Sequence, residues 1–286
     1  MSADTHLVIA TMGGTTVREK DLIDRTQVPR TRQSLAEDLR RLGLKTGAVA
    51  LVHSSLSSLG WVCGASVAVV QALMDVITPS GTLVMPTHSG EYSDPANWEH
   101  PPVPSSWQGP IRESMPAFDP QTAPFRGMGR VPETFRTWPG ALRSSHPAVS
   151  FAAWGRHAEF VTQEHSLDHS LGEGSPLARI YELDGRVLLL GVGHESNTSF
   201  HLAEYRAPGA RRIEAGAPIL EGGRRVWKTY EDIELDEEVF EEIGADFENA
   251  VGLRYFRVGS ARARLFSQRE AVDFARGQIA HRRRYS

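Results

Sequence analysis

The apolar run Val187–Leu190 constrains the fold more than any other stretch of the sequence. It is short, lacks the alternation of a half-exposed strand and ends abruptly at Gly191 and Gly193, so it predicts a buried β-strand. In open α/β sheets, ligands bind where the carboxyl end of such a strand leads into a helix. We therefore expect the chemistry of this protein just after Leu190.

The residues that follow predict a helix carrying a general base. Ser196, Asn197 and Thr198 are consecutive candidate N-caps, so a helix is expected to begin there. That helix would place His201 and Glu204 on one face, where the carboxylate can accept one ring N–H and leave the other nitrogen free to take a proton. A lone His-x-x-Glu pair is more often structural than catalytic, and its position after the buried strand is what favours catalysis here.

A second strand-to-helix junction carries a run of hydroxyl groups. The strand expected over residues 48–53 leads into a turn at residues 54–60 that holds four serines, and a helix is expected over residues 67–77. Hydroxyls and free backbone N–H groups at such a junction suit a phosphate or pyrophosphate. Serine-rich turns are, however, more often only turns.

The order of the remaining elements predicts the architecture. Further strands are expected at 82–86 and 149–154, and helices at 31–42, 133–137, 156–161 and 176–184. This repeated order of strand, loop and helix predicts an α/β fold, a three-layer α/β/α sandwich with a mixed central sheet. The C-terminal portion is expected to be antiparallel and helical, with a hairpin around Gly222–Gly223, acidic and mixed helices after it, and a last helix capped by Ser267.

Two segments show no regular spacing of apolar residues. Residues 1–28 are interpreted as an N-terminal extension that precedes a single domain spanning residues 29–286. Residues 95–126 are rich in Pro and Trp, so we expect a long excursion with little regular structure that serves as a lid or wall.

Composition excludes several classes of protein. The formal charge of −4 gives no support to nucleic-acid binding, and no apolar run approaches the ~20 residues of a membrane span. The start of the chain lacks the pattern of a signal peptide, so a cytoplasmic location is expected. Cys63 is the single cysteine, which agrees with a reducing compartment and excludes cysteine-based zinc motifs.

Several stretches, taken together and in order, resemble the aminoglycoside 3-N-acetyltransferase family of antibiotic acetyltransferases. They are Val52–Leu56, Gly81–Pro86, Phe118–Pro120, Arg143–Pro147, Gly172–Pro176, Leu188–Gly191, His201–Glu204 and Trp227–Thr229. Within that family, the Tyr205–Pro208 and Trp98–Trp107 segments look closest to a branch of Gram-positive bacterial proteins.

The resemblance implies an α/β/α fold, acetyl-coenzyme A as the donor, an aminoglycoside as the acceptor and no metal. It implies His201 as the general base and Glu204 as its supporting acid. The residues it implies for coenzyme A binding are His53, Ser54, Ser55, Leu56, Ser57, Arg143, Ser144 and Thr198. Those it implies for acceptor binding are Glu91, Asp94, Asp232 and Glu234. A monomer or a homodimer is expected.

The expected reaction is direct attack of the acceptor's 3-amino group on the thioester in a ternary complex. His201 would take the amine proton, while Thr198, Ser199 or the N–H groups at the helix start would stabilise the thioester oxygen. If Asp232 and Glu234 share a strand, their i, i+2 spacing places both carboxylates on one face, where they can bracket two ammonium groups. The simpler interpretation is that they begin a solvated acidic run.

Three alternatives remain open from the sequence. The chain could be an acyl-CoA-dependent N-acyltransferase that acts on a different amine. It could be a metal-dependent hydrolase with His194, His201 and Glu204 as ligands, although His-x6-His-x2-Glu is not a standard zinc spacing. It could also be a protein that binds coenzyme A or sequesters a drug without turnover.

Overall fold

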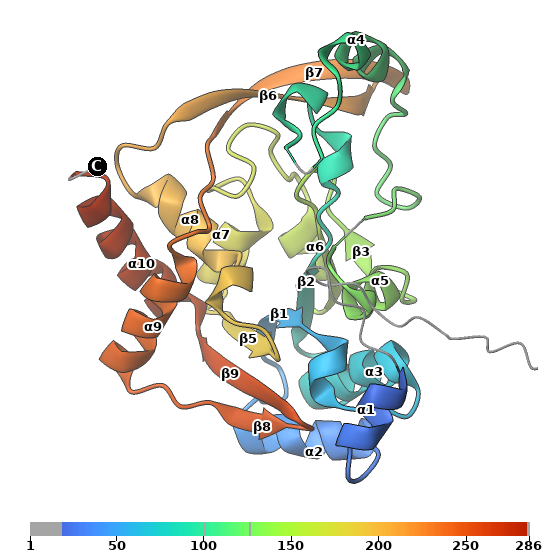
Figure 1. Cartoon of the computed structure of the whole chain (residues 1–286), viewed down its shortest axis with the longest axis vertical. Coiled ribbons are helices and arrows are strands. Elements are labelled where there is room, and N and C mark those ends of the chain that lie inside the picture. The colour runs from blue at the N-terminus through green and yellow to red at the C-terminus, as the bar shows by residue number, and fades with distance from the viewer. Residues whose placement is uncertain (1–18, 100, 126, 285–286) are drawn as a thin grey trace, which may run out of the picture.

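A mixed seven-stranded sheet forms the centre of the part of the chain that the structure describes (Figure 1). This computed structural model describes residues 19–99, 101–125 and 127–284. The strand order is β3-β4-β2-β1-β5-β9-β8. The strands are β1 Val49–Ser54, β2 Thr82–Pro86, β3 Leu142–Arg143, β4 Phe151–Gly155, β5 Arg186–Leu190, β8 Phe256–Val258 and β9 Ala261–Ser267.

The parallel strands β2, β1 and β5 lie at the centre of this sheet. Every residue of β1 is buried, as expected for a strand with helices on both faces. Leu51 of β1 pairs with Val84 of β2 on one side and with Val187 of β5 on the other. Ser54 pairs with Leu190, so β1 and β5 end side by side. The predicted buried strand is therefore confirmed, and its end lies beside the end of β1.

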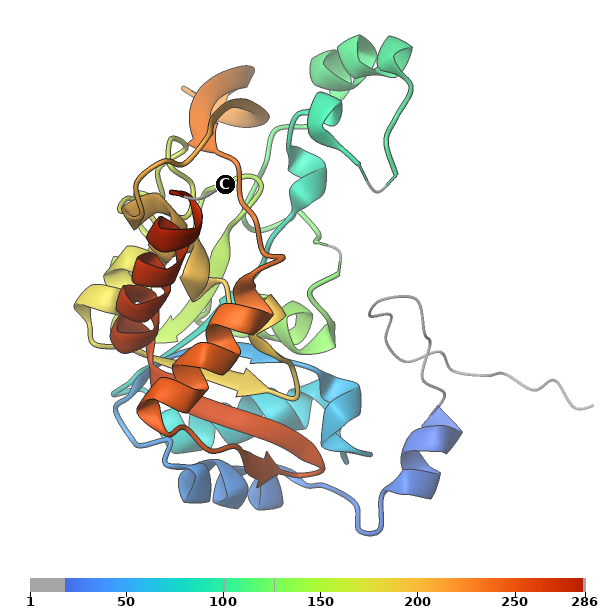
Figure 2. The ribbon, with the colours of Figure 1, turned by 60° about the vertical axis from the view of Figure 1, so that its left-hand side comes forward.

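Helices cover both faces of the sheet, which confirms the predicted three-layer sandwich (Figure 2). One face is covered by α2 Arg32–Leu42, α3 Ala65–Ile77 and α5 Arg130–Arg136. The other is covered by α6 Ala158–Thr162, α7 Pro176–Glu182, α8 Ser199–Arg206, α9 Phe240–Val251 and α10 Gln268–Arg282. A hydrophobic core lies between the sheet and the helices on each face, and alternate residues of β1 point into the two cores. Val52 packs in the core with α2, α3 and α5, and Leu51 packs in the core on the other face.

Several helix ends follow the capping signals in the sequence. Thr31 and Ser34 form a capping box at the start of α2, and Gly43 ends that helix in the left-handed conformation. The Ser175 side chain accepts a hydrogen bond at the start of α7, and Ser267 does so at the start of α10. These boundaries depend on local chemistry, which is why the sequence predicts them.

The antiparallel hairpin of β6 Arg212–Glu221 and β7 Arg224–Ile233 reaches across one end of the molecule (Figure 1). Its turn residues, Gly222 and Gly223, both have positive φ, as a two-residue hairpin turn of this kind requires. The predicted hairpin is therefore confirmed.

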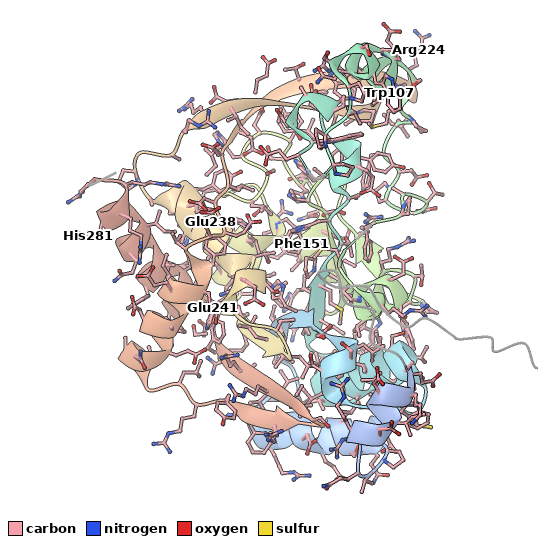
Figure 3. The ribbon with its side chains drawn as sticks, viewed as in Figure 1. Trp107, Phe151, Arg224, Glu238, Glu241 and His281 are labelled. Atoms are coloured by element: carbon pink, nitrogen blue, oxygen red, sulfur yellow. The ribbon has the colours of Figure 1, made fainter. Side chains whose placement is uncertain are left out.

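The structure corrects two predictions. The 95–126 segment contains a helix, α4 Ser105–Ser114, and the hairpin supports it: Arg225 Nε donates to the Met115 carbonyl at 2.8 Å. Trp107 of α4 and Arg224 of the hairpin lie at the same corner of the molecule (Figure 3). Strands β8 and β9 occupy a stretch where acidic and mixed helices were expected.

Part of the predicted N-terminal extension packs against the domain. Helix α1, Glu19–Arg25, buries Leu22, and its Glu19 Oε1 accepts a hydrogen bond from Trp61 Nε1 at 3.1 Å. The prediction for residues 1–18 lies outside the described residues. In the part of the chain that is described, no helix is both long enough and apolar enough to cross a membrane.

Two helical glycines predict opposite effects of the same substitution on stability. A Cβ added at Gly244 of α9 would collide with the ring of His194, whereas a Cβ added at Gly277 of α10 meets nothing within 4 Å. We expect Gly277→Ala to raise the free energy of unfolding by about 0.5–1 kcal/mol, because alanine favours a helix interior. We expect Gly244→Ala to lower it by about 1–3 kcal/mol through overpacking. Urea denaturation of both variants checks this, and equal shifts of the same sign would contradict it.

Candidate active site

A cavity of about 400 Å³ opens at the carboxyl ends of β1, β2 and β5. This is the position at which open α/β sheets bind ligands, and the volume lies within the usual range of about 300–1,000 Å³ for ligand sites. The polar residues that line it are His53, Ser54, His88, Glu195, Ser196, Asn197, Thr198, His201 and Glu237.

His201 and Glu204 form a hydrogen-bonded pair at the cavity wall. Helix α8 begins at Ser199 with Thr198 as its N-cap, which confirms the predicted start. His201 Nδ1 lies 2.6 Å from Glu204 Oε2; the carboxylate is 2% exposed, and the histidine side chain keeps 11% exposed. A carboxylate can only accept this hydrogen bond, so Nδ1 carries the proton and Nε2 of the neutral ring is the acceptor.

The second oxygen of Glu204 is held from two other parts of the chain. Oε1 accepts from the backbone N–H of Asp236 at 3.0 Å, and Arg283 Nη2 lies 3.8 Å away. Arg283 Nη1 also donates to the Glu204 carbonyl at 2.9 Å. The loop after the hairpin and the end of α10 therefore fix the carboxylate that orients His201. Sequence reasoning missed both partners, because they become neighbours of Glu204 only in the folded chain.

Two further histidines line the cavity in a neutral state. Burial lowers the pKa of His53 to about 3 and that of His88 to about 3, and the nearby charge of His201 adds to both effects. His53 Nε2 lies 3.4 Å from Thr198 Oγ1. The ring of His88 meets that of Phe151 edge-on, with 5.3 Å between the ring centroids. His88 was not predicted, although its place just after β2 was a usable signal.

The serine turn after β1 contributes one hydroxyl to the cavity. Ser54 lines it, and in the described part of the molecule its buried Oγ has no hydrogen-bond partner. Ser55 Oγ instead lies 3.3 Å from Ser57 Oγ and accepts from Ser58 Oγ at 2.9 Å. Leu56 is buried in the core. The structure thus separates Ser54, at the cavity, from Ser55, Leu56 and Ser57, which do not line it.

Arg143 and Ser144 lie outside the lining of the cavity. The Arg143 guanidinium donates to the Thr87 carbonyl and to Ser89 Oγ, each at 2.9 Å, and to the Ala123 carbonyl at 2.6 Å. Burial lowers the pKa of Arg143 to about 10, which leaves it charged at neutral pH. Ser144 is buried. Arg143 therefore joins the loop after β2 to the loop near Ala123.

Asp232 and Glu234 do not face a common site. Asp232 is buried and accepts a hydrogen bond from the Tyr205 hydroxyl, whereas Glu234 is exposed and pairs with Arg211. Strand β7 ends at Ile233, so Glu234 lies outside it. The alternation of side chains that would place both carboxylates on one face of a strand therefore does not extend to Glu234.

Other carboxylates line the cavity. Of the two remaining predicted acids, Asp94 pairs with Arg112 Nη2 at 2.7 Å, and Glu91 lies in a short 3₁₀ turn. Neither lines the cavity, while the exposed Glu195 and Glu237 do. The acidic residues that line the cavity therefore follow β5 and the hairpin.

Helix α9 holds the loop that carries Glu195. Glu241, at the start of α9, accepts the backbone N–H of His194 at 2.7 Å and that of Glu195 at 3.4 Å. Glu195 Oε1 itself accepts the N–H of Gly193 at 2.9 Å. These bonds fix the backbone of the loop beside His201.

The ligand set of the metal-dependent hydrolase is not formed, which corrects that alternative. His194 Nε2 lies 3.0 Å from Glu248, and its ring stacks on Phe200, while His201 pairs with Glu204. Among residues 19–99, 101–125 and 127–284, no group of three or more His, Cys, Asp or Glu side chains is arranged to hold a metal ion.

Known proteins similar to this chain agree with the resemblance seen in the sequence. Residues 51–280 match the family described as aminoglycoside 3-N-acetyltransferase. A relative from Bacillus subtilis strain 168, the SPbeta prophage-derived aminoglycoside N(3')-acetyltransferase-like protein YokD, is 52% identical over 257 residues, covering 90% of this chain and 94% of the relative. A relative in this Gram-positive organism agrees with the expected branch.

Solved structures extend the comparison to ligands. The crystal structure of the Bacillus subtilis YokD protein has a TM-score of 0.91 and 50% identity, covering 93% of this chain and 99% of that one. AAC-IIIb, solved as a binary complex with CoASH, has a TM-score of 0.80 and 33% identity, covering 89% and 98%. AAC-VIa bound to sisomicin has a TM-score of 0.80 and 31% identity, covering 89% and 99%.

The buried histidines predict a loss of stability in mild acid. Burial lowers the pKa of His146 to about 4, so between pH 6.5 and 4 its ring takes up a proton in the unfolded chain but not in the folded one. Stability should therefore fall with pH in this window, by about 1.4 kcal/mol per pH unit for one histidine. His146→Asn should reduce the slope by that amount. Urea denaturation between pH 4.5 and 7 measures both slopes, and parallel profiles for wild type and His146→Asn would contradict the prediction.

Proposed function

The chain belongs to the aminoglycoside 3-N-acetyltransferase family, and we propose that it transfers the acetyl group of acetyl-coenzyme A to the 3-amino group of an aminoglycoside. The observation that carries the proposal is the His201–Glu204 pair at 2.6 Å in the wall of a cavity at the carboxyl edge of the sheet. Family membership indicates acetyl transfer to an amine, and this pair provides the general base that such a transfer requires.

The proposed reaction is direct attack in a ternary complex. The neutral amine attacks the thioester carbon through its nitrogen lone pair, and as the C–N bond forms the nitrogen gives one proton to Nε2 of His201. Glu204 stabilises the imidazolium that forms. As the C–N bond forms and the C–S bond breaks, the coenzyme A thiolate leaves and takes the proton back from His201.

The donor is proposed to enter beside the end of β1. Ser54 places a buried hydroxyl there that has no hydrogen-bond partner among the described residues, and Thr198, which also lines the cavity, has its Oγ1 3.4 Å from His53 Nε2. The complex of AAC-IIIb with CoASH supports a coenzyme A site in this fold. His53 and His88 stay neutral because of burial, so neither competes with His201 for the amine proton above about pH 5.

The acceptor is proposed to be a polycation that Glu195 and Glu237 bind at the mouth of the cavity. Both side chains are exposed and both line the cavity, so they can attract ammonium groups. The complex of AAC-VIa with sisomicin supports an aminoglycoside as the ligand class.

The role of His201 predicts a selective loss of turnover. His201→Ala should lower kcat by about two to four orders of magnitude, as expected for loss of a general base, while coenzyme A affinity changes little. His281→Ala, at an exposed position, is the matched control. Release of free thiol from acetyl-coenzyme A with a panel of aminoglycosides and small amines measures turnover. Near-wild-type turnover of a folded His201→Ala protein would overturn the assignment, and an uncharged best acceptor would overturn the aminoglycoside proposal.

Acceptor binding predicts a charge-dependent effect on KM. The double variant Glu195→Gln/Glu237→Gln should raise the acceptor KM at least about tenfold and the donor KM much less, because only the acceptor is cationic. Added salt should weaken acceptor binding to wild type more than to the double variant. Glu234→Gln is the control, since that carboxylate is paired with Arg211 away from the cavity. A larger effect of Glu234→Gln would instead support the acceptor site expected from the sequence.

A further inference from the structure

The backbone N–H groups at the start of α8 are already engaged. Those of residues 198–201 donate to acceptors within residues 196–198, over distances of 3.0–3.2 Å. A helix start often stabilises an anion through free N–H groups, but here those groups have intramolecular acceptors. The negative charge that develops on a thioester oxygen beside His201 therefore needs another donor.

Asn197 offers such a donor. It is fully buried and lines the cavity, and its side-chain Oδ1 accepts the N–H of Ser199 at 3.2 Å. This bond identifies the oxygen end of the amide and leaves Nδ2 as the opposite end. Among the described residues, Nδ2 has no hydrogen-bond partner. A buried amide donor without a partner is costly, and a ligand oxygen would satisfy it.

We propose that Asn197 Nδ2 donates a hydrogen bond to the acyl oxygen of the bound thioester and stabilises the oxyanion of the transition state, an inference that rests on the proposed function. When the amine nitrogen attacks the carbonyl carbon, the π electrons move to the oxygen that Nδ2 holds. They return as the C–S bond breaks and the thiolate leaves. Asn197 is thus a catalytic residue that neither gains nor loses a proton.

Position and rigidity favour Asn197 over the other polar groups of the cavity. Asn197 lies two residues before α8 and His201 lies in the first turn of α8, and both line the same cavity, so a carbonyl bound between them can meet the donor while the amine meets the base. Thr198 Oγ1 lies 3.4 Å from His53 Nε2 and can bond there, and the Ser54 hydroxyl can rotate. An amide anchored at Oδ1 needs no reorganisation as the charge develops.

The kinetic test compares substitutions that remove the donor with and without its anchor. Asn197→Asp keeps an oxygen for the Ser199 N–H but has no amide donor, and Asn197→Ala removes both. Each should lower kcat by about 100-fold or more, with the acetyl-coenzyme A KM changed only a few-fold. Asn249→Asp, on the exposed side of α9, makes the same chemical change as a control and should match wild type. Activity of folded Asn197→Asp and Asn197→Ala within threefold of wild type would overturn the proposal.

A spectroscopic test keeps the inference separate from the identity of the acceptor. The infrared carbonyl band of acetyl-coenzyme A labelled with ¹³C at the carbonyl should shift to lower wavenumber on binding to wild type. In Asn197→Ala, the wavenumber of this band should lie closer to the one measured in water-free solvent. If no aminoglycoside is acetylated but this shift depends on Asn197, the proposed function fails and the inference stands. An equal shift in wild type and Asn197→Ala, or no bound thioester band at all, overturns the inference.

Discussion

Burial of the parallel strands β1, β2 and β5, of which only Arg186 at the start of β5 is exposed, is the constraint on which the rest of the structure depends. A strand buried on both faces needs a helical layer on each side, and alternate side chains of β1 serve the two cores. Parallel strands also end at the same edge, so the segments after them converge there. The cavity, its histidines and the start of α8 lie at that edge.

The proposed proton acceptor at this edge, His201, depends on a carboxylate that is held from several directions. Glu204 binds His201 through one oxygen and accepts the Asp236 N–H through the other, with Arg283 nearby. The loop that holds Asp236 also supplies Glu237 to the cavity mouth. The proposed binding site for the aminoglycoside and the carboxylate that orients His201 thus both depend on one loop. That loop connects the hairpin to α9.

Burial divides the polar groups of the cavity into different roles. It lowers the pKa of His53 and His88, so these histidines stay uncharged beside His201. It leaves the Asn197 amide with a fixed, unpartnered donor end. The exposed Glu195 and Glu237 remain at the mouth, where charge can attract a cation without a desolvation cost to the carboxylates. The groups proposed for proton transfer, for oxyanion stabilisation and for attraction of the acceptor therefore differ in their exposure within one cavity.

The sequence by itself determined whatever depends on neighbours along the chain. The buried run before Gly191, the caps at Thr31 and Ser267 and the His201–Glu204 spacing all act within a few residues, so their patterns predicted the strands, helix ends and hydrogen-bonded pair. Only the tertiary structure decided which distant groups meet. It paired Glu234 with Arg211, buried Asp232 against Tyr205, and supported the Pro-containing α4 with the hairpin. These contacts depend on strand ends and on packing between remote segments, for which a local pattern carries no signal.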